Sequence, residues 1–473
     1  MRGSVSGASR VGPRAGESGN SIDSGRIKNF AFTSCAPPPR KTNATTKTVM
    51  IFRFLKSRIM SEMAVKKVPI PSRGVDYRGK LVLAPMVRSG ELPSRLLALH
   101  YGADLVWGPE TVDRSMLGTT RRINPSTKTI DFIRVPHQGQ KQPPPNAKES
   151  VIYRLHPERE GRKLIFQIGT SDPDRAVAAA RLIAPDVAGI DVNAGCPKPF
   201  STHDGMGAAL LKTPDKLVAI LEALVKNIVP EFQIGISVKI RILDTPTETE
   251  ALVRRLVATG ITGLTVHCRT TPMRPRERAI RGQLQMVREV CHEAGVACLM
   301  NGDVEGRDSA VELIEEFGVD GAMIATAAEK NSSCFRTKEE GGMAPWDEVT
   351  ETYLRLAMET ENKFGNTKYM LNQIIPGKQP AYKRVQSCKS YISVCEALGL
   401  THLKDMATDA DRAVGLISDS DAKSAVALNG NSKRKNDGAS IMQTSEEISA
   451  KRQKTDEPVK ETGVLQPPVA LSV

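Results

Sequence analysis

The stretch GIDVNAGCPKPFSTHDGMGAALL, residues 189–211, shows the repeating unit from which the fold can be predicted. A short apolar run (189–195) leads through Cys196 and Pro197 into a polar loop, and a helix-like segment follows from Gly207. This order is typical of a buried parallel strand that is connected to a helix. Two roles are open for the cysteine. Taken alone, a cysteine in this position is more often a packed core residue than a reactive group.

The same unit recurs between residues 80 and 330. Eight short runs rich in apolar residues each precede a polar or glycine-bearing turn, and they lie at 81–87, 104–110, 164–169, 189–195, 236–242, 263–269, 297–303 and 321–327. Amphipathic helical patterns follow, and they lie at 172–183, 206–228 (divided near Pro214), 247–259, 283–293 and 309–317. The longest gap, between the second and third runs, is predicted to be a loop around Pro143-Pro144-Pro145.

Eight strands that alternate with helices predict an α/β fold, a (β/α)8 TIM barrel. A doubly wound open sheet is the competing fold. It fits less well because no G-x-G-x-x-G motif follows the first predicted strand.

Polar side chains end seven of the eight predicted strands, at the edge where such barrels carry their chemistry. They include Arg88, Glu110, Gln167, Asn193 with Cys196, Lys239 with Arg241, His267 with Arg269, and Asn301 with Asp303. Burying so many polar groups is costly unless a ligand or a hydrogen-bonding network uses them. The pattern therefore indicates a binding site.

Three features favour a phosphorylated aromatic cofactor. The turns Asn301-Gly302-Asp303 and Ala325-Thr326-Ala327 follow the last two strands, which is the usual phosphate site of this fold. Lys239 supplies a cation at the mouth, and Gln167 can donate to and accept from a ring edge. Flavin mononucleotide (FMN) fits all three, although phosphate-binding barrels without a flavin share these features.

The net charge of +13 indicates either a polyanionic partner or basic disordered tails. Residues 363–404 are predicted to be helical and hold seven basic residues against one acidic residue, Glu396, with Tyr369, Tyr382 and Tyr391 between them. A solvated helix face around a core is one interpretation. A surface that follows RNA phosphates is the other, and it makes Lys383 and Arg384 candidates for substrate contact.

The eight cysteines form no CxxC pair, so no zinc site is predicted. No apolar run is long enough for a membrane helix, so we expect a soluble cytoplasmic or nuclear monomer. Residues 1–75 are either a mitochondrial-type presequence or a disordered leader, and 407–473 form a disordered basic tail. The clusters 433–435 and 451–454 in this tail resemble a bipartite nuclear localisation signal. Between the two ends we expect a barrel at 78–340 and a helical domain at 345–406.

Several motifs, taken together, resemble the tRNA-dihydrouridine synthases over residues 78–405. They are APMV (84–87), FQIGTSDPDRA (166–176), the opening stretch (189–211), VKIRI (238–242), VHCRT (266–270) and NGDV (301–304). NTKY (366–369) and VCEALGL (394–400) are similar to the eukaryotic branch that acts on position 20 of the D-loop.

The resemblance implies that NADPH or NADH reduces FMN, that the flavin delivers hydride to C6 of a uridine, and that Cys196 protonates C5. The implied flavin contacts are Pro85, Met86, Val87, Gln167, Lys239, His267, Asn301, Gly302, Asp303, Ala325 and Thr326. Asn193 and Arg269 are the implied contacts to the tRNA substrate. A proton donor must be neutral, and an ordinary thiol with a pKa of about 8.5 meets this condition.

Three positions depart from the family pattern. Thr326 stands where an arginine usually pairs with the FMN phosphate, Cys268 replaces a common glycine, and NSSCF (331–335) replaces Asn-Pro-Ser-Ile-Phe. Losing one charge-assisted hydrogen bond weakens binding by about 1.5–3 kcal/mol. Two alternatives therefore stay open beside the synthase: a flavin barrel that oxidises or reduces a free pyrimidine, and a tRNA-binding protein with a degraded flavin site.

Overall fold

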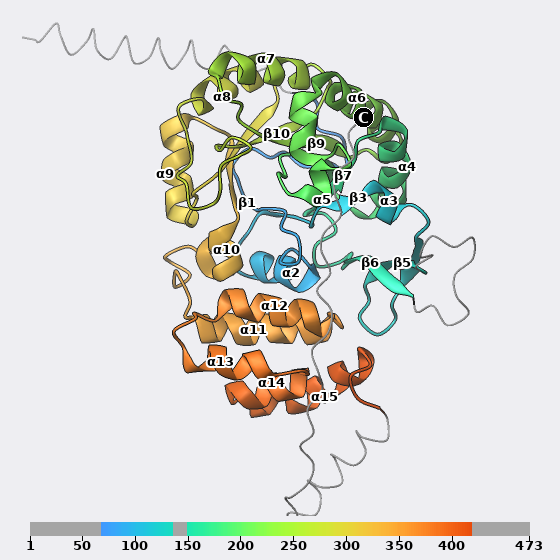
Figure 1. Ribbon diagram of the computed structural model, residues 1–473, viewed down its shortest axis with the longest axis vertical. Helices are drawn as coiled ribbons and strands as arrows, with labels where there is room; N and C mark the ends of the chain where they lie inside the picture. Colours follow the sequence, from blue (N-terminus) through green and yellow to red (C-terminus); the bar gives the residue numbers. More distant parts are fainter. Residues whose placement is uncertain (1–67, 136–148, 419–473) are drawn as a thin grey trace, which may run out of the picture. The chain divides into compact units, whose positions relative to one another are not determined.

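The computed structural model describes residues 68–135 and 149–418 (Figure 1). Residues 1–67 of the predicted leader, the triple proline at 143–145 and the two basic clusters at 433–435 and 451–454 lie outside the described residues. Residues 68–75, also assigned to the leader, are bonded to the barrel: the N–H of Val68 donates to the Gly295 carbonyl and that of Arg73 to the Gln233 carbonyl. Within them, no helix combines the length and the apolar character that are needed to cross a membrane.

Eight parallel strands close into a barrel. They are β1 (Lys80–Leu83), β2 (Leu105–Trp107), β7 (Leu164–Gly169), β8 (Gly189–Ala194), β9 (Gly235–Arg241), β10 (Gly263–His267), β11 (Ala297–Asn301) and β12 (Gly321–Ile324). Each strand pairs with the next along the chain, β2 pairs with β7, and β12 returns to β1 with Lys80 opposite Gly321. The predicted TIM barrel is confirmed, and the open sheet is excluded because the ring of strands has no free edge.

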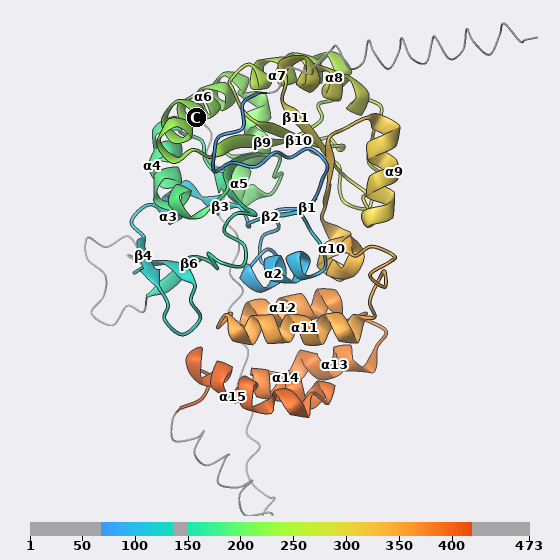
Figure 2. The same cartoon turned by 180° about the vertical axis from the view of Figure 1, so that it is seen from behind.

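Helices surround the barrel (Figure 2). They are α4 (Pro173–Ile183), α6 (Pro214–Phe232), α7 (Pro246–Val257), α8 (Leu284–Ala294) and α9 (Arg307–Phe317). The predicted start of α4 is confirmed: Asp172 accepts the backbone N–H of Arg175 at 2.8 Å, next to a proline at the first helical position. The predicted division near Pro214 is also found, because a 3-10 turn (Gly207–Lys212) precedes α6.

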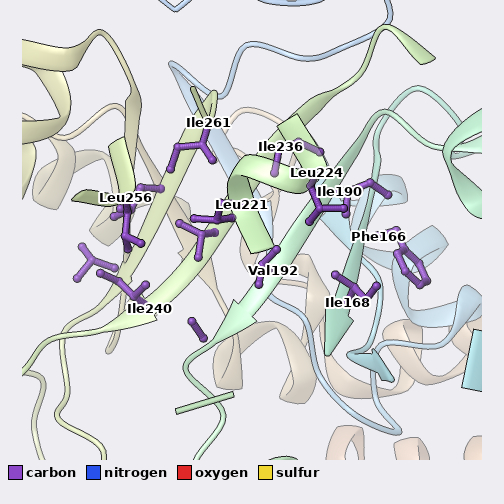
Figure 3. Packing of buried hydrophobic residues seen from close by; sticks show 14 of the residues in the cluster. Phe166, Ile168, Ile190, Val192, Leu221, Leu224, Ile236, Ile240, Leu256 and Ile261 are labelled. Atoms are coloured by element: carbon purple, nitrogen blue, oxygen red, sulfur yellow. The ribbon is translucent and has the colours of Figure 1, made fainter. Parts of the chain in front are cut away.

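The core lies between the strands and these helices. Figure 3 shows Phe166, Ile190 and Val192 of β7 and β8 among the buried residues that include Leu221 and Leu224 of α6. All five side chains have no accessible surface. Burying a large apolar side chain stabilises a fold by about 1.5–3 kcal/mol. This packing fixes where each strand ends, and hence where the polar residues that follow it lie.

Most strands end one to four residues earlier than predicted. β1, for example, ends at Leu83 instead of residue 87. The residues beyond it leave the sheet and form the rim of the barrel, and Pro85 has no N–H to continue the ladder. The polar residues that were predicted at strand ends divide into two groups. Some lie within the observed strands (Gln167, Asn193, Lys239, Arg241, His267 and Asn301), and the others follow a strand on the rim (Arg88, Glu110, Cys196, Arg269 and Asp303).

The gap between β2 and β7 holds structure that the sequence pattern did not predict. After β3 (Thr111–Val112) and α3 (Asp113–Met116), an antiparallel sheet forms from β4 (Thr120–Ile123), β5 (Ile130–Arg134) and β6 (Ser150–Leu155). Its buried Phe132, Tyr153 and Leu155 join the barrel core, and the rings of Tyr153 and Phe166 lie 5.0 Å apart. The expectation of a plain loop was wrong for these segments because their apolar side chains pack on the barrel.

Five helices follow the barrel: α11 (Trp346–Glu359), α12 (Phe364–Ile374), α13 (Pro380–Ser387), α14 (Tyr391–Leu398) and α15 (Lys404–Ala413). The predicted helical part is confirmed, but its predicted end at residue 406 was too early, because α15 continues to Ala413 within the segment that was predicted to be a disordered tail. These helices share a second apolar core with Leu92, Leu96 and Leu97 of α2 (Leu92–His100), and both views show α11 and α12 beside α2. The guanidinium of Arg88, on the barrel rim, lies 4.4 Å from the ring centroid of Tyr369 in α12.

Candidate active site

The carboxyl ends of the strands open onto two adjoining hollows of about 370 and 400 Å³, which is within the usual range of small-molecule sites. The first is lined by most of the predicted site residues: Pro85, Met86, Val87, Gln167, Asn193, Cys196, Lys239, His267, Asn301, Ala325 and Thr326. The second is lined by Arg269, Gly302 and Asp303, and shares Arg241, His267, Asn301, Ala325 and Thr326 with the first. Lys383 and Arg384, on α13, line neither hollow.

The loop that carries Cys196 is held by backbone contacts. Asn193 Oδ1 accepts the N–H of Gly195 at 2.9 Å and that of Cys196 at 3.1 Å, and Ala208 N–H donates to the Cys196 carbonyl at 2.9 Å. Gly207 has a φ of +57°, and a Cβ there would come within 2.6 Å of the Cys196 carbonyl oxygen. The Gly-Met-Gly segment is thus required for the chain to fold back over the cysteine.

The thiol of Cys196 is held in its neutral form. Its side chain is half-buried. Burial raises the pKa of Cys196, and the nearby carboxylate of Glu110 raises it further, against a weaker opposite effect of Lys198. The thiol is therefore protonated at neutral pH, as a proton donor must be.

Cations surround the centre of the first hollow. The ammonium group of Lys239, on β9, has no hydrogen-bond or ion-pair partner within the described part of the chain. Its burial and the neighbouring Arg241 lower its pKa to about 8. Burial, with Lys239, Arg241 and Arg269 close by, lowers the pKa of His267 to about 2, so its imidazole is neutral. An unpaired buried cation is costly, and an anionic ligand would remove that cost.

Gln167 is oriented by a group inside the barrel. Its Nε2 donates to Asp191 Oδ2 at 2.8 Å, and Ser237 Oγ donates to the other oxygen, Oδ1, at 2.7 Å. Asp191 has no accessible surface, and burial raises its pKa to about 6. With one N–H committed to Asp191, Gln167 keeps its carbonyl oxygen and its second N–H for a ligand.

The second hollow is built from tightly bonded turns. Asp303 has a φ of +51°, accepts the N–H of Ala279 at 2.7 Å and pairs with Arg269. Arg269 also donates to the carbonyls of Pro275 and Glu277, and its Nη1 lies 3.2 Å from His267 Nε2. Arg269 thus supports His267 and this loop, and it lines the hollow beside that of Cys196. Lys330, one turn along α10 (Thr326–Lys330) from Thr326, lines the same hollow.

Sequence reasoning assigned no role to several residues that shape the site. Arg241 donates from Nε to the Gly195 carbonyl at 2.7 Å and from Nη1 to the Thr270 carbonyl at 2.9 Å, and so supports the cysteine loop. Glu110 and Tyr369 line the first hollow. Arg241 and Glu110 do end predicted strands, and this position was the available signal. Tyr369 lies on α12, after the last barrel strand, and its sequence position alone does not place it here.

Some basic side chains of the helical region are bonded within the chain, and others are not. Lys368 Nζ donates to the carbonyls of Gln386 and Cys388 at 2.7 and 2.8 Å, and Arg384 Nε donates to the carbonyl of Ala397 at 2.8 Å. Tyr391 is buried and donates to the Asn362 carbonyl, so it belongs to the core. Lys383 is exposed and makes no such contact within the described residues.

Comparison with known proteins gives a consistent result. The family model described as "Dihydrouridine synthase (Dus)" matches residues 82–398. The tRNA-dihydrouridine(20) synthase [NAD(P)+] of Schizosaccharomyces pombe is 48% identical over 333 residues, which are 69% of this chain and 66% of the relative, just under two thirds of its length. The protein of the same name from Saccharomyces cerevisiae is 45% identical over 323 residues, 67% of this chain and 82% of the relative.

Among solved structures, DHODH from Eimeria tenella in complex with ferulenol is 13% identical. It aligns over 74% of this chain and 95% of that chain with a TM-score of 0.33. This score is too low to support an argument about function.

Proposed function

The chain belongs to the dihydrouridine synthase family, and from this premise we propose that it reduces a uridine of the tRNA D-loop, at position 20, to 5,6-dihydrouridine with NADPH or NADH as reductant. One observation carries the proposal: the neutral, half-buried thiol of Cys196 lines the same hollow as the unpaired cation of Lys239. The neutral thiol can act as an acid, and the lysine beside it can bind a negatively charged cofactor ring.

We propose FMN as the cofactor, because the donors present match its groups. Gln167, Lys239 and His267 would meet the ring, with Pro85, Met86 and Val87 beside it, and Asn301, Gly302, Asp303, Ala325 and Thr326 would meet the phosphate side. When bound, the flavin supplies the hydride that reduces C6 of the uracil ring. Lys330 has no ion-pair partner among the described residues, and we propose that it pairs with the phosphate in place of an arginine at position 326.

The remaining chemistry belongs to the chain itself. The Cys196 Sγ–H would give its proton to C5 of the uracil, on the face opposite to the hydride. Asn193 has its oxygen committed to the cysteine loop, so its Nδ2, which also faces the carboxylate of Glu110, is the group that would donate to the uracil edge. Arg269 would act through His267 and the adjoining loop. The base must leave the RNA stack to enter the hollow.

The cofactor can be tested on purified protein. We expect it to show the absorption bands of a bound flavin, or to gain them when FMN is added and the excess is removed by gel filtration. FMN fluorescence is expected to fall on binding, because the ring enters a protein environment. A protein that stays colourless after FMN addition would contradict the enzyme reading and favour a tRNA-binding protein without flavin chemistry.

We also propose that residues 78–340 hold the cofactor and that residues 345–406, extended by α15 to Ala413, contact the tRNA. Exposed lysines on this part would follow the phosphates and give salt-dependent affinity. A free pyrimidine would not require such a surface. We propose a cytoplasmic or nuclear location, because tRNA is present in both compartments.

Lys383→Ala is expected to weaken tRNA binding several-fold, and to lower the slope of log K against log salt by about one, because one phosphate contact is lost. Arg384→Ala is a less specific test, since it also removes a bond to the Ala397 carbonyl at the end of α14. The measurement is tRNA affinity at four salt concentrations. The matched control is Lys226→Ala, an exposed lysine on α6, which should leave the slope unchanged. Equal slopes for the wild type, Lys383→Ala and Lys226→Ala would contradict the assignment of Lys383.

A further inference from the structure

Glu110 is a carboxyl group in the first hollow that the chemistry above does not use. It follows β2, and its Oε1 accepts a hydrogen bond from Ser201 Oγ at 3.0 Å. Its Oε2 is buried and has no partner within the described residues. Such a carboxylate is costly to keep, so its position calls for an explanation.

The surroundings of Glu110 are built to admit it next to the cysteine. A Cβ at Gly169 would come within 2.6 Å of Glu110 Oε1, so the glycine leaves the space that the carboxylate fills. Its partner Ser201 is fully buried on α5 (Pro199–Thr202), in the loop that begins at Cys196. Ser201 Oγ and Cys196 Cβ both lie within 3.2 Å of the point where a Cβ of Gly207 would sit.

The charges that face the thiol explain what a carboxylate does there. Lys198 from the cysteine loop, and Lys239 and Arg241 from β9, are cations close enough to interact with the Cys196 sulfur. Glu110 is a carboxylate that interacts with both the sulfur and Lys198. Burial is the largest influence on the pKa of Cys196 and raises it, whereas the neighbouring cations favour the thiolate, which is a nucleophile and cannot donate a proton. A carboxylate beside the thiol makes a second negative charge unfavourable.

We propose that Glu110 is a positioning residue of Cys196, whose negative charge adds to the effect of burial and keeps the thiol protonated in the presence of the surrounding cations. The proposal rests on the proposed function, because it assigns the acid of that reaction. Glu110 is not expected to touch the uracil. Ser201 orients the carboxylate of Glu110, and Glu110 influences the reaction only through Cys196.

The test is the pH dependence of Cys196 alkylation by iodoacetamide, followed on the Cys196 peptide by mass spectrometry. Glu110→Gln retains the shape and can still accept from Ser201, but it removes the charge. We expect the midpoint of the alkylation profile to fall by about one pH unit, since a like charge beside the thiol has been removed. Glu110→Asp keeps the charge and is expected to stay within a few tenths of a unit of wild type.

The outcomes separate the proposal from its alternatives. An unchanged midpoint in Glu110→Gln, or an equal shift in Glu110→Asp, would overturn it, because a purely structural residue has no reason to distinguish charge from shape. If the amide variant does not fold, the aspartate variant still decides, since a midpoint that falls by a full unit there would contradict the proposal. The control Glu250→Gln removes an exposed carboxylate on α7 and should leave the profile unchanged. Alkylation needs neither tRNA nor flavin, so failure of the proposed function would be seen separately, as a protein that forms no dihydrouridine.

Discussion

Cys196→Ala is expected to lose most dihydrouridine formation, by about 10²- to 10⁴-fold, the usual contribution of a positioned general acid. Flavin content and NADPH oxidation with an artificial electron acceptor should stay close to wild type. The reason lies in the loop: the contacts that shape it use the backbone N–H and carbonyl of Cys196, and alanine retains both. The product is measured by mass spectrometry of nucleosides from a tRNA substrate.

The control is Cys334→Ala, which removes a buried thiol of the 3-10 turn Ser332–Phe335, outside both hollows. It is expected to cost some stability and little activity. Product at the wild-type level in Cys196→Ala would remove this cysteine as the acid. A loss of flavin together with activity would instead show that the thiol holds the cofactor site together.

The barrel was predictable because each strand carries its own signal. Residues 164–169 and 189–195 are mostly apolar, carry polar groups near their ends and precede a helix. Because this local pattern recurs along the chain, only the closure of the strands into a ring has to be inferred. The antiparallel sheet β4–β6 was not predictable in the same way. Its strands depend on Phe132 and Tyr153 packing against the barrel, a contact that joins positions far apart in the sequence.

One part of the candidate site was likewise predictable from the sequence, and another part was not. Topology brings Gln167, Lys239 and His267 together, because parallel strands share one edge, so their common position could be predicted. The sequence does not say which donors and acceptors are already used within the protein. The side-chain oxygen of Asn193 accepts an N–H of the cysteine loop, and the guanidinium of Arg269 donates to a carbonyl of its own loop. These commitments depend on rim loops, whose conformation follows from tertiary contacts.

Lys239→Met is expected to act in opposite directions on stability and on flavin binding. At pH 7 the wild-type lysine is charged and half-buried, its ammonium has no ion-pair partner within the described residues, and its pKa is lowered to about 8 from its ordinary value. Methionine retains the apolar stem without the charge. The flavin-free variant should therefore be more stable to urea by about 1–2 kcal/mol at pH 7. Its FMN affinity should fall by about 10- to 100-fold, the worth of one charge-assisted hydrogen bond.

The pH dependence of the stability and of the FMN affinity follows from the lowered pKa of Lys239. Between about pH 8 and the ordinary lysine pKa, the unfolded chain holds a proton on residue 239 that the folded chain has lost, so the wild type gains stability as pH rises. The advantage of Lys239→Met should therefore shrink from pH 7 to pH 10, and wild-type FMN affinity should weaken from pH 7 to pH 9. Lys226→Met, on the exposed face of α6, should change neither quantity. If Lys239→Met lowers both stability and affinity, the lysine acts through packing. A gain in stability with a loss of flavin would instead show a cation that the fold retains, at a cost to its own stability, for an anionic ligand.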